Sequence, residues 1–295
     1  MTEALVPAHV ESTSLAGNIG AEIIGVHIGE RISEEVIAGI REILLRHKVV
    51  FLRDQELDYV RLVAFAQRFG HLTLGHPIYA TLPDRPFLRE MDSQHGSRAN
   101  HWHTDLTFLD RPPAFAFLHG VIIPPVGGDT IWANTVAAYA SLSEELRELA
   151  DRLRIVHSND SDYTHATVGT RRDYLVTAYE AEHPAVVVHP DTGERSLLLG
   201  GFARYVVGLG PQASRDLIRL LQDHVTRPEH TVRWKWRAGD VAIWDNLATQ
   251  HYAIYDYGSQ HRRGERVTVA GSVPVGIDDR QSVALSGDAT AYYAD

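Results

Sequence analysis

The sequence predicts a mainly β protein in which an antiparallel barrel or sandwich is flanked by helices. Three observations support this fold class: many short apolar runs bounded by Gly, Pro, Asp or Asn, few amphipathic helical segments, and no glycine-rich strand-to-helix turn of the nucleotide-binding kinds. The chain has 295 residues, of which 44% are hydrophobic and 22% charged. These values are typical of globular proteins, and we expect a single domain over residues 1–295.

Three segments carry helical signals. Ser33 is followed by two glutamates and by apolar residues spaced three and four apart, which predicts an N-capped helix over 33–47. The same periodicity predicts helices at about 57–69 and 211–225.

Short apolar runs predict the strands. They cover residues 48–53, 114–123, 129–134, 185–190, 195–200, 231–246 and 265–274. Two polar stretches with weak periodicity, about 72–100 and 159–184, are predicted to be long loops. Because loops of this length in a compact chain are commonly functional, we interpret both as lids over a site.

Charge and cysteine content exclude several classes of protein. The chain has 28 Lys and Arg against 38 Asp and Glu, a net charge of −10, which argues against nucleic-acid and anionic-membrane partners. No apolar run is long enough to span a membrane, and the N-terminus does not look like a signal peptide, so we expect a cytoplasmic protein. Without cysteine, thiolate metal sites and cysteine nucleophiles are excluded, and the strong metal ligands must be His, Asp or Glu.

One segment near the middle of the chain holds candidate metal ligands. If residues 101–108 form a strand, His103 and Asp105 point to the same side. Alone, this pair is more often structural, but the segment 239–251 ends at a third candidate, His251. Two histidines and a carboxylate that leave three positions open are typical of non-haem Fe(II) oxygenases, and zinc is an alternative occupant of the same ligands.

Anion-binding groups follow the last candidate ligand. Arg262 and Arg266 are four residues apart and share a face on a strand, whereas Arg263 faces the other way. Two inward arginines indicate two bound anions, and the alternative is a set of surface ion pairs. Thr130, after a tight glycine turn, offers a hydroxyl donor.

Together these elements resemble the taurine dioxygenase family of Fe(II)- and 2-oxoglutarate-dependent oxygenases, over about residues 20–274. The segments that carry the resemblance are GHPIY (75–79), HWHTDLTF (101–108), PPVGGDTIWAN (124–134), HPDTGERSLL (189–198) and GDVAIWDNLATQHYAIYDY (239–257). The resemblance implies a double-stranded β-helix, or jelly-roll, core. From about residue 228 the chain is also similar to the bacterial alkylsulfate dioxygenases.

The resemblance also implies a role for each candidate residue. The implied iron ligands are His103, Asp105 and His251. Thr130 and Arg262 are implied to hold the distal carboxylate of 2-oxoglutarate, and Arg266 is implied to bind the anionic group of the substrate together with His76 and Tyr79. In one departure from the taurine enzyme, Ala99 stands where that enzyme has asparagine.

The implied activity is hydroxylation, with O2 and 2-oxoglutarate, of the carbon next to the sulfonate or sulfate group of a small organic acid. The products would be an aldehyde, sulfite or sulfate, succinate and CO2. An aryloxyalkanoate carboxylate is the alternative substrate. A zinc hydrolase would give Thr130 and Arg262 no purpose, and a non-catalytic anion-binding barrel would not need three metal ligands. Relatives imply a homo-oligomer, either a dimer or a tetramer.

Overall fold

A seven-stranded sheet forms the larger wall of the fold. The computed structural model describes residues 10–29, 32–79, 81–95, 99–160 and 177–293. The strand order is β1-β2-β3-β13-β5-β15-β4, with β2 and β3 parallel and the other neighbours antiparallel. The strands are β1 (Glu11–Ser14), β2 (Ala21–Ile24), β3 (Val49–Leu52), β4 (Arg89–Asp92), β5 (Phe115–Ile122), β13 (Val241–Asp245) and β15 (Arg263–Val269).

A three-stranded antiparallel sheet packs on the inner face of the larger one. It has the order β12-β6-β14, with β6 (Thr130–Asn134), β12 (Thr231–Trp234) and β14 (Thr249–Ala253). Aromatic residues of both sheets fill the space between them: Phe51 stacks on Trp234 with ring centroids 4.1 Å apart, and Trp132 lies edge-on to Phe51. These sheets form the jelly-roll core, and the predicted mainly β fold with flanking helices is confirmed.

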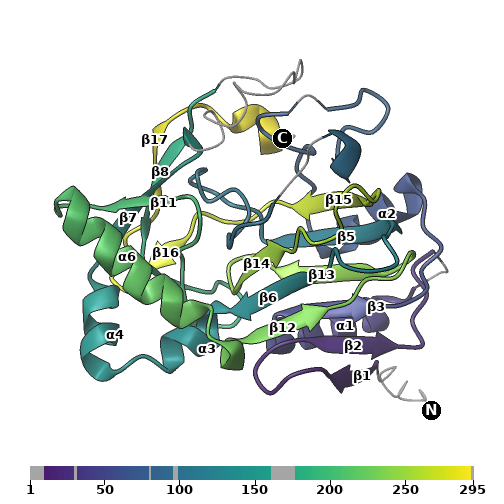
Figure 1. The fold of residues 1–295 in the computed structure, drawn as a ribbon, viewed down its shortest axis with the longest axis horizontal. Helices are drawn as coiled ribbons and strands as arrows, with labels where there is room; N and C mark the ends of the chain where they lie inside the picture. Colours follow the sequence, from purple (N-terminus) through teal and green to yellow (C-terminus); the bar gives the residue numbers. More distant parts are fainter. Residues whose placement is uncertain (1–9, 30–31, 80, 96–98, 161–176, 294–295) are drawn as a thin grey trace, which may run out of the picture.

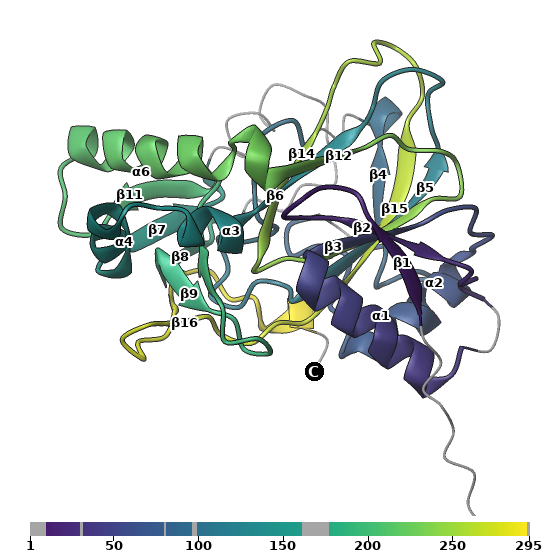
Figure 2. The same cartoon turned by 90° about the horizontal axis from the view of Figure 1, so that it is seen from below.

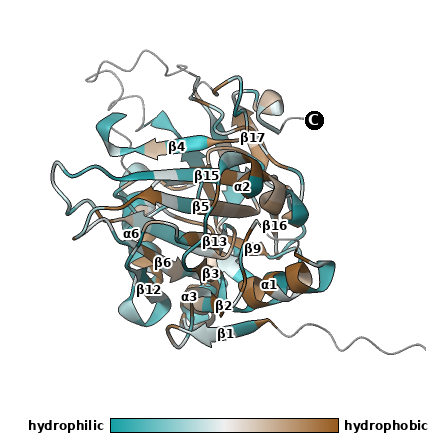
Figure 3. Cartoon of the chain, turned by 90° about the vertical axis from the view of Figure 1, so that its right-hand side faces the viewer, coloured by the Kyte–Doolittle hydropathy of each residue, from teal (hydrophilic) through white to brown (hydrophobic). Residues whose placement is uncertain are grey.

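Two helices cover the outer face of the larger sheet, as Figure 2 shows. These are α1 (Glu34–His47), whose N-cap Ser33 accepts a hydrogen bond from the Val36 N–H, and α2 (Tyr59–Ala66), continued by η1 (Gln67–Phe69). Val50 and Leu52 of β3 pack under these helices, whereas Val49 and Phe51 face the aromatic layer inside. A strand buried on both faces is therefore apolar throughout, and the brown strands in Figure 3 show this pattern.

A second core lies at the other end of the molecule, beneath α6 in Figure 1. Its helices are α3 (Thr135–Ala140), α4 (Glu144–Asp151) and α6 (Pro211–Val225), and η3 (Pro228–His230) follows α6. Two small sheets, β11-β7-β8-β17 and β10-β9-β16, complete it. Their strands are β7 (Arg154–Ser158), β8 (Glu180–Pro184), β9 (Val186–Val188), β10 (Arg195–Leu197), β11 (Ala203–Val206), β16 (Val275–Gly276) and β17 (Val283–Ser286).

The two predicted loops are only partly irregular. The segment 72–100 contains β4 and η2 (Ser93–His95), and β4 extends the larger sheet beside β15. Most of 159–184, residues 161–176, lies outside the described residues, and β8 begins near its end. The single domain over 1–295 and the two lids stay predictions. Within the described residues, no helix combines the length and apolar character needed to cross a membrane.

The tail after residue 274 packs against the core, although the sequence shows little periodicity there. Its last described element, η4 (Thr290–Tyr293), buries two tyrosines in a cluster with Ile78, Leu106 and Phe108. The carbonyl of Tyr292 also accepts a hydrogen bond from the Leu74 N–H at 2.8 Å. The tail thus fixes the chain on either side of the candidate ligands.

Candidate metal and anion site

Three ligand-type side chains meet inside the jelly roll. His103 Nε2 lies 3.7 Å from Asp105 Oδ1, and His251 Nε2 lies 4.0 Å from the same oxygen. One ligand atom of each residue falls within 4.8 Å of the other two, and all three residues are buried. The structure therefore gathers, around one point, side chains from segments that are nearly 150 residues apart in the sequence.

Backbone pairing brings the two histidines together. The His103 N–H donates to the His251 carbonyl at 3.0 Å, and the His251 N–H donates to the His103 carbonyl at 2.8 Å. His103 forms only an isolated bridge, so the strand expected over 101–108 is wrong. A turn follows instead, in which Leu106 has a φ of 55°. This left-handed residue redirects the chain, so the turn rather than strand periodicity aims Asp105 at the histidines.

Asn246 holds the backbone of Asp105 in place. Its Oδ1 accepts from the Asp105 N–H at 2.9 Å, and its Nδ2 donates to the carbonyls of Asp105 and Pro113 at 3.1 and 3.0 Å. The side chain is fully buried. The role of Asn246 was not predicted from the sequence. The feature that could have indicated it is the Asp-Asn turn between a buried strand and His251.

Replacing Asn246 by leucine is expected to lower the free energy of unfolding by about 3 kcal/mol, because it leaves three buried backbone groups without partners. Urea denaturation followed by tryptophan fluorescence measures the change. The matched control is Gln212→Leu, which removes an amide from an exposed position on α6 and should change stability by less than about 0.5 kcal/mol. Equal effects in the two variants would contradict the role given to Asn246.

The protonation states of the histidines suit a metal. His103 Nδ1 lies 2.8 Å from the His101 carbonyl, so it carries the proton and leaves Nε2 as a lone-pair donor. Burial, followed by the neighbouring His251, lowers the pKa of His103 to about 3, and burial lowers the pKa of His251 to about 4. Both imidazoles are therefore neutral at pH 7, which is the form that coordinates metals.

The donor set fits a divalent transition metal. Two imidazole nitrogens and one carboxylate suit iron, manganese or zinc better than calcium or magnesium, which prefer oxygen ligands only. Asp105 Oδ2 is buried and has no hydrogen-bond partner among the described residues, which is unusual for a carboxylate oxygen and consistent with a site built for a cation.

Arg266 forms a buried ion pair with the carboxylate of this set. Its Nη1 lies 2.6 Å from Asp105 Oδ1, and both side chains are less than 9% exposed. Burial alone would raise the pKa of Asp105, but Arg266 and the two imidazoles lower it, so the carboxylate is ionised. A metal ion and Arg266 would thus compete for the same carboxylate oxygen.

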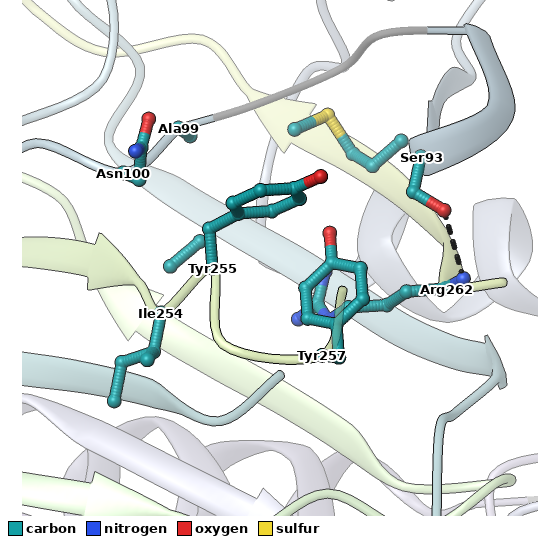
Figure 4. Close-up of a pocket in the computed structure, with 9 residues that line it drawn as sticks. Ser93, Ala99, Asn100, Ile254, Tyr255, Tyr257 and Arg262 are labelled. Carbon is teal, nitrogen blue, oxygen red and sulfur yellow. Dashed lines mark hydrogen bonds between the residues drawn. The ribbon is translucent and has the colours of Figure 1, made fainter. Parts of the chain in front are cut away.

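Arg262 and Thr130 form a separate polar contact. Arg262, just before β15, donates from Nε to the Gly128 carbonyl at 3.0 Å and from Nη2 to Thr130 Oγ1 at 3.5 Å. Thr130 Oγ1 also accepts from Trp236 Nε1 at 2.9 Å. Figure 4 shows the pocket beside Arg262, where the Arg262 N–H donates to Ser93 Oγ at 3.0 Å. The pocket is lined by Met91, Ser93, Ala99, Asn100, Ala253, Ile254, Tyr255, Tyr257 and Arg262.

His76 and Tyr79 lie next to each other in the first predicted loop, with ring centroids 4.6 Å apart. His76 Nδ1 accepts from the Ile78 N–H at 3.1 Å, so Nε2 carries the ring proton. Burial, with the nearby Arg89 and Arg266, lowers the pKa of His76 well below its usual range. His76 is therefore a neutral hydrogen-bond donor close to Arg266.

A further group of metal-ligand type occurs in the described part of the chain. It comprises Glu90, Asp92 and His95, of which His95 is exposed. Asp92 Oδ1 already accepts from the backbone of Gln94 and lies 3.0 Å from His261 Nε2. Glu90 also lies 2.8 Å from Arg263, so the carboxylates of this cluster have polar partners in the protein without a metal ion.

Comparisons with known proteins identify the family of this chain. The sequence model of one family, described as taurine catabolism dioxygenase TauD, TfdA family, matches residues 11–268. An alkylsulfatase of Acinetobacter baylyi is 46% identical over 271 residues, which are 89% of this chain and 85% of the relative. An alpha-ketoglutarate-dependent sulfate ester dioxygenase of Pseudomonas putida is 47% identical over 277 residues, 91% of this chain and 92% of the relative.

Solved structures give the same result for the fold. The crystal structure of a taurine dioxygenase from Burkholderia xenovorans is 41% identical in sequence and superposes with a TM-score of 0.84, covering 97% of this chain and 98% of that one. The family match spans most of the chain and includes every candidate site residue, so the resemblance drawn from the motifs is confirmed. The chain belongs to the TauD, TfdA family of dioxygenases.

Proposed function

We propose that this enzyme is an Fe(II)- and 2-oxoglutarate-dependent dioxygenase that oxidises small alkyl sulfates. The observation that carries the proposal is the convergence of His103, Asp105 and His251, with a buried arginine 2.6 Å from the carboxylate. This arrangement suits the binding of an anionic substrate next to a metal ion. The two curated relatives named above, at 46% and 47% identity, are an alkylsulfatase and a sulfate ester dioxygenase, which favours sulfate esters over other small acids.

In this proposal the triad holds iron through two imidazole nitrogens and one carboxylate oxygen. When bound, the iron supplies the activation of O2, coupled to decarboxylation of 2-oxoglutarate, that hydroxylates the substrate carbon. The protein residues orient both organic anions and keep the reaction away from bulk water, which the burial of all three ligands supports.

Charge balance indicates which anion each of the two arginines binds. One carboxylate on a divalent cation leaves a charge of +1, and the proximal carboxylate of 2-oxoglutarate brings the total to zero. The distal carboxylate then needs its own cation, for which Arg262 is suited because Thr130 lies beside it as a further donor. Burial lowers the pKa of Arg262, but a guanidinium remains charged at pH 7. Arg266 is assigned to the substrate sulfate, with His76 as a neutral donor.

The overall reaction is balanced. Hydroxylation of the carbon bearing the ester oxygen gives a hemiacetal sulfate, whose C–O bond to sulfate breaks as the hydroxyl loses its proton. One alkyl sulfate, one O2 and one 2-oxoglutarate therefore yield one aldehyde, one sulfate, one succinate, one CO2 and one proton. Sulfonates would react in the same way and release sulfite.

Coupled turnover tests the proposal. Enzyme reconstituted with Fe(II) is supplied with 2-oxoglutarate and hexyl sulfate, taurine or phenoxyacetate, while oxygen, succinate and sulfate or sulfite are measured. We expect hexyl sulfate to give equal amounts of succinate and sulfate and to stop reacting without oxygen. Sulfate release under anaerobic conditions would indicate a hydrolase instead. Preferred turnover of phenoxyacetate would indicate that the substrate is a carboxylate rather than a sulfate ester.

A further inference from the structure

A second arginine lies beside Arg266 on the inner face of the barrel. Strands β4 and β15 are antiparallel, and Arg89 of β4 is the direct partner of Arg266 in their register. Direct partners project to the same face, with Cβ atoms about 4.5–5.5 Å apart. Arg266 points inward to Asp105, so Arg89 belongs to the same face. Two guanidinium side chains thus start from adjacent positions next to the candidate metal site.

The rest of the strand pair supports this assignment of faces. Val267 and Val269 of β15 pack in the cluster beneath α1 and α2, so the odd-numbered positions of β15 face outward. Even-numbered Gly264 is paired with Met91, which lines the pocket beside Arg262, and this pair faces inward. Arg89 and Met91 are two residues apart and therefore share the inner face.

Like charges in direct cross-strand positions are unfavourable unless an opposite charge accompanies them. The outer face of the same strand pair shows how this is resolved. Glu90 and Glu265 are direct partners there, and Arg263 Nη1 lies 2.8 Å from Glu90 and 3.7 Å from Glu265. On the inner face the anion that accompanies Arg266 is Asp105, which the proposed function assigns to the metal. An anionic substrate would take over this role.

Contacts in the first predicted loop fix the position of Arg89. Its guanidinium carbon lies 3.8 Å from the centre of the Tyr79 ring, and the Tyr79 ring contacts His76. Stacking uses the flat face of a guanidinium, whereas its N–H donors lie in the plane of the group. The charge of Arg89 also contributes, together with that of Arg266, to the lowered pKa of His76. Arg89 and His76 thus both contact the Tyr79 ring, and Arg89 stands beside Arg266 in the strand register.

We propose that Arg89 is a specificity-determining residue that binds the anionic group of the substrate together with Arg266 and selects sulfate esters over carboxylates. A sulfate ester presents three terminal oxygens in a tetrahedral arrangement, which two guanidinium groups and one imidazole N–H can address. A carboxylate presents two coplanar oxygens, which a single arginine satisfies through a bidentate pair. The inference rests on the proposed function, because it concerns the substrate of the same site.

Substrate binding without turnover tests the role of Arg89. Hexyl sulfate and heptanoate are titrated by calorimetry into protein loaded with Mn(II) and N-oxalylglycine, a combination that does not support oxidation. We expect Arg89→Gln to weaken hexyl sulfate binding about 10- to 100-fold, as loss of a charge-assisted pair does, and heptanoate binding by less than about threefold. In turnover, KM for hexyl sulfate should rise while KM for 2-oxoglutarate stays unchanged.

Arg263→Gln is the matched control, because it removes the same charge from the outer face of the same strand pair; its hexyl sulfate affinity should remain within about twofold of the wild type. Thermal denaturation checks that both variants fold. If Arg89→Gln does not fold, Arg89→Lys replaces it, and hexyl sulfate binding should weaken at least about threefold because lysine cannot bind bidentately. Hexyl sulfate affinity within twofold of the wild type in the folded Arg89 variant would overturn the inference.

The two proposals fail in different ways. Wild-type protein that binds hexyl sulfate without oxidising it would refute the proposed function, while the loss of binding in Arg89→Gln would still support the inference. Oxidation of hexyl sulfate by an Arg89→Gln variant with unchanged affinity would refute the inference and leave the proposed function standing.

Discussion

Replacing His251 by alanine is expected to weaken Mn(II) binding at least about 100-fold and to abolish 2-oxoglutarate-dependent oxygen consumption. The reason is that three protein ligands become two, and loss of a ligand should exceed the 10- to 100-fold effect typical of residues that only orient a ligand. The hydrogen bonds between His251 and His103 use backbone atoms, so alanine preserves this bridge and removes only the contacts of the imidazole with neighbouring rings such as those of His103 and Trp244. Calorimetric titration with Mn(II) measures the affinity without requiring turnover.

His95→Ala is the control for this experiment. His95 belongs to the other described group of metal-ligand type, with Glu90 and Asp92, and it is exposed. We expect this variant to bind Mn(II) as the wild type does. Loss of Mn(II) binding in His95→Ala, with retention in His251→Ala, would place the metal at the cluster of Glu90, Asp92 and His95. The proposed reaction would then have no metal centre.

The structure brings together the three candidate ligands that the sequence indicated, but part of the reasoning that led to them was wrong. A strand over residues 101–108 was expected to aim His103 and Asp105 the same way, whereas the structure has an isolated bridge followed by a turn with Leu106 at positive φ. The Asn246 side chain and the tail cluster stabilise this turn. Such contacts join segments more than a hundred residues apart, and no local periodicity encodes them.

The fold could be predicted from the sequence more completely than the site. Buried strands such as β3 and β13 are recognisable as short apolar runs, and α1 is recognisable by its cap and its periodicity. Arg89, in contrast, lies in a stretch that the sequence indicated as a loop. Its importance depends on the register of β4 against β15, and register between distant strands is fixed by tertiary packing rather than by local sequence.

Arg262→Ala and Arg266→Ala are expected to impair different steps. Without Arg262, the distal carboxylate of 2-oxoglutarate loses a partly buried charged partner, and the apparent KM for 2-oxoglutarate should rise at least about 30-fold. Without Arg266, KM for hexyl sulfate should rise by a similar factor, while decarboxylation of 2-oxoglutarate in the absence of substrate remains measurable. Succinate formation with and without hexyl sulfate, over a range of 2-oxoglutarate concentrations, separates the two effects. Equal loss of both activities in Arg266→Ala would contradict separate roles.

The ion pair between Arg266 and Asp105 adds a second measurable consequence. Because Arg266 Nη1 lies 2.6 Å from the carboxylate oxygen that faces both imidazoles, this cation competes with a metal ion for Asp105. Arg266→Ala should therefore bind Mn(II) at least as tightly as the wild type, although it binds the substrate less tightly. In the wild type, Mn(II) and hexyl sulfate should each tighten the binding of the other, since the metal releases Arg266 for the sulfate. Calorimetric titration of each in the presence of the other measures this coupling, which should disappear in Arg266→Ala.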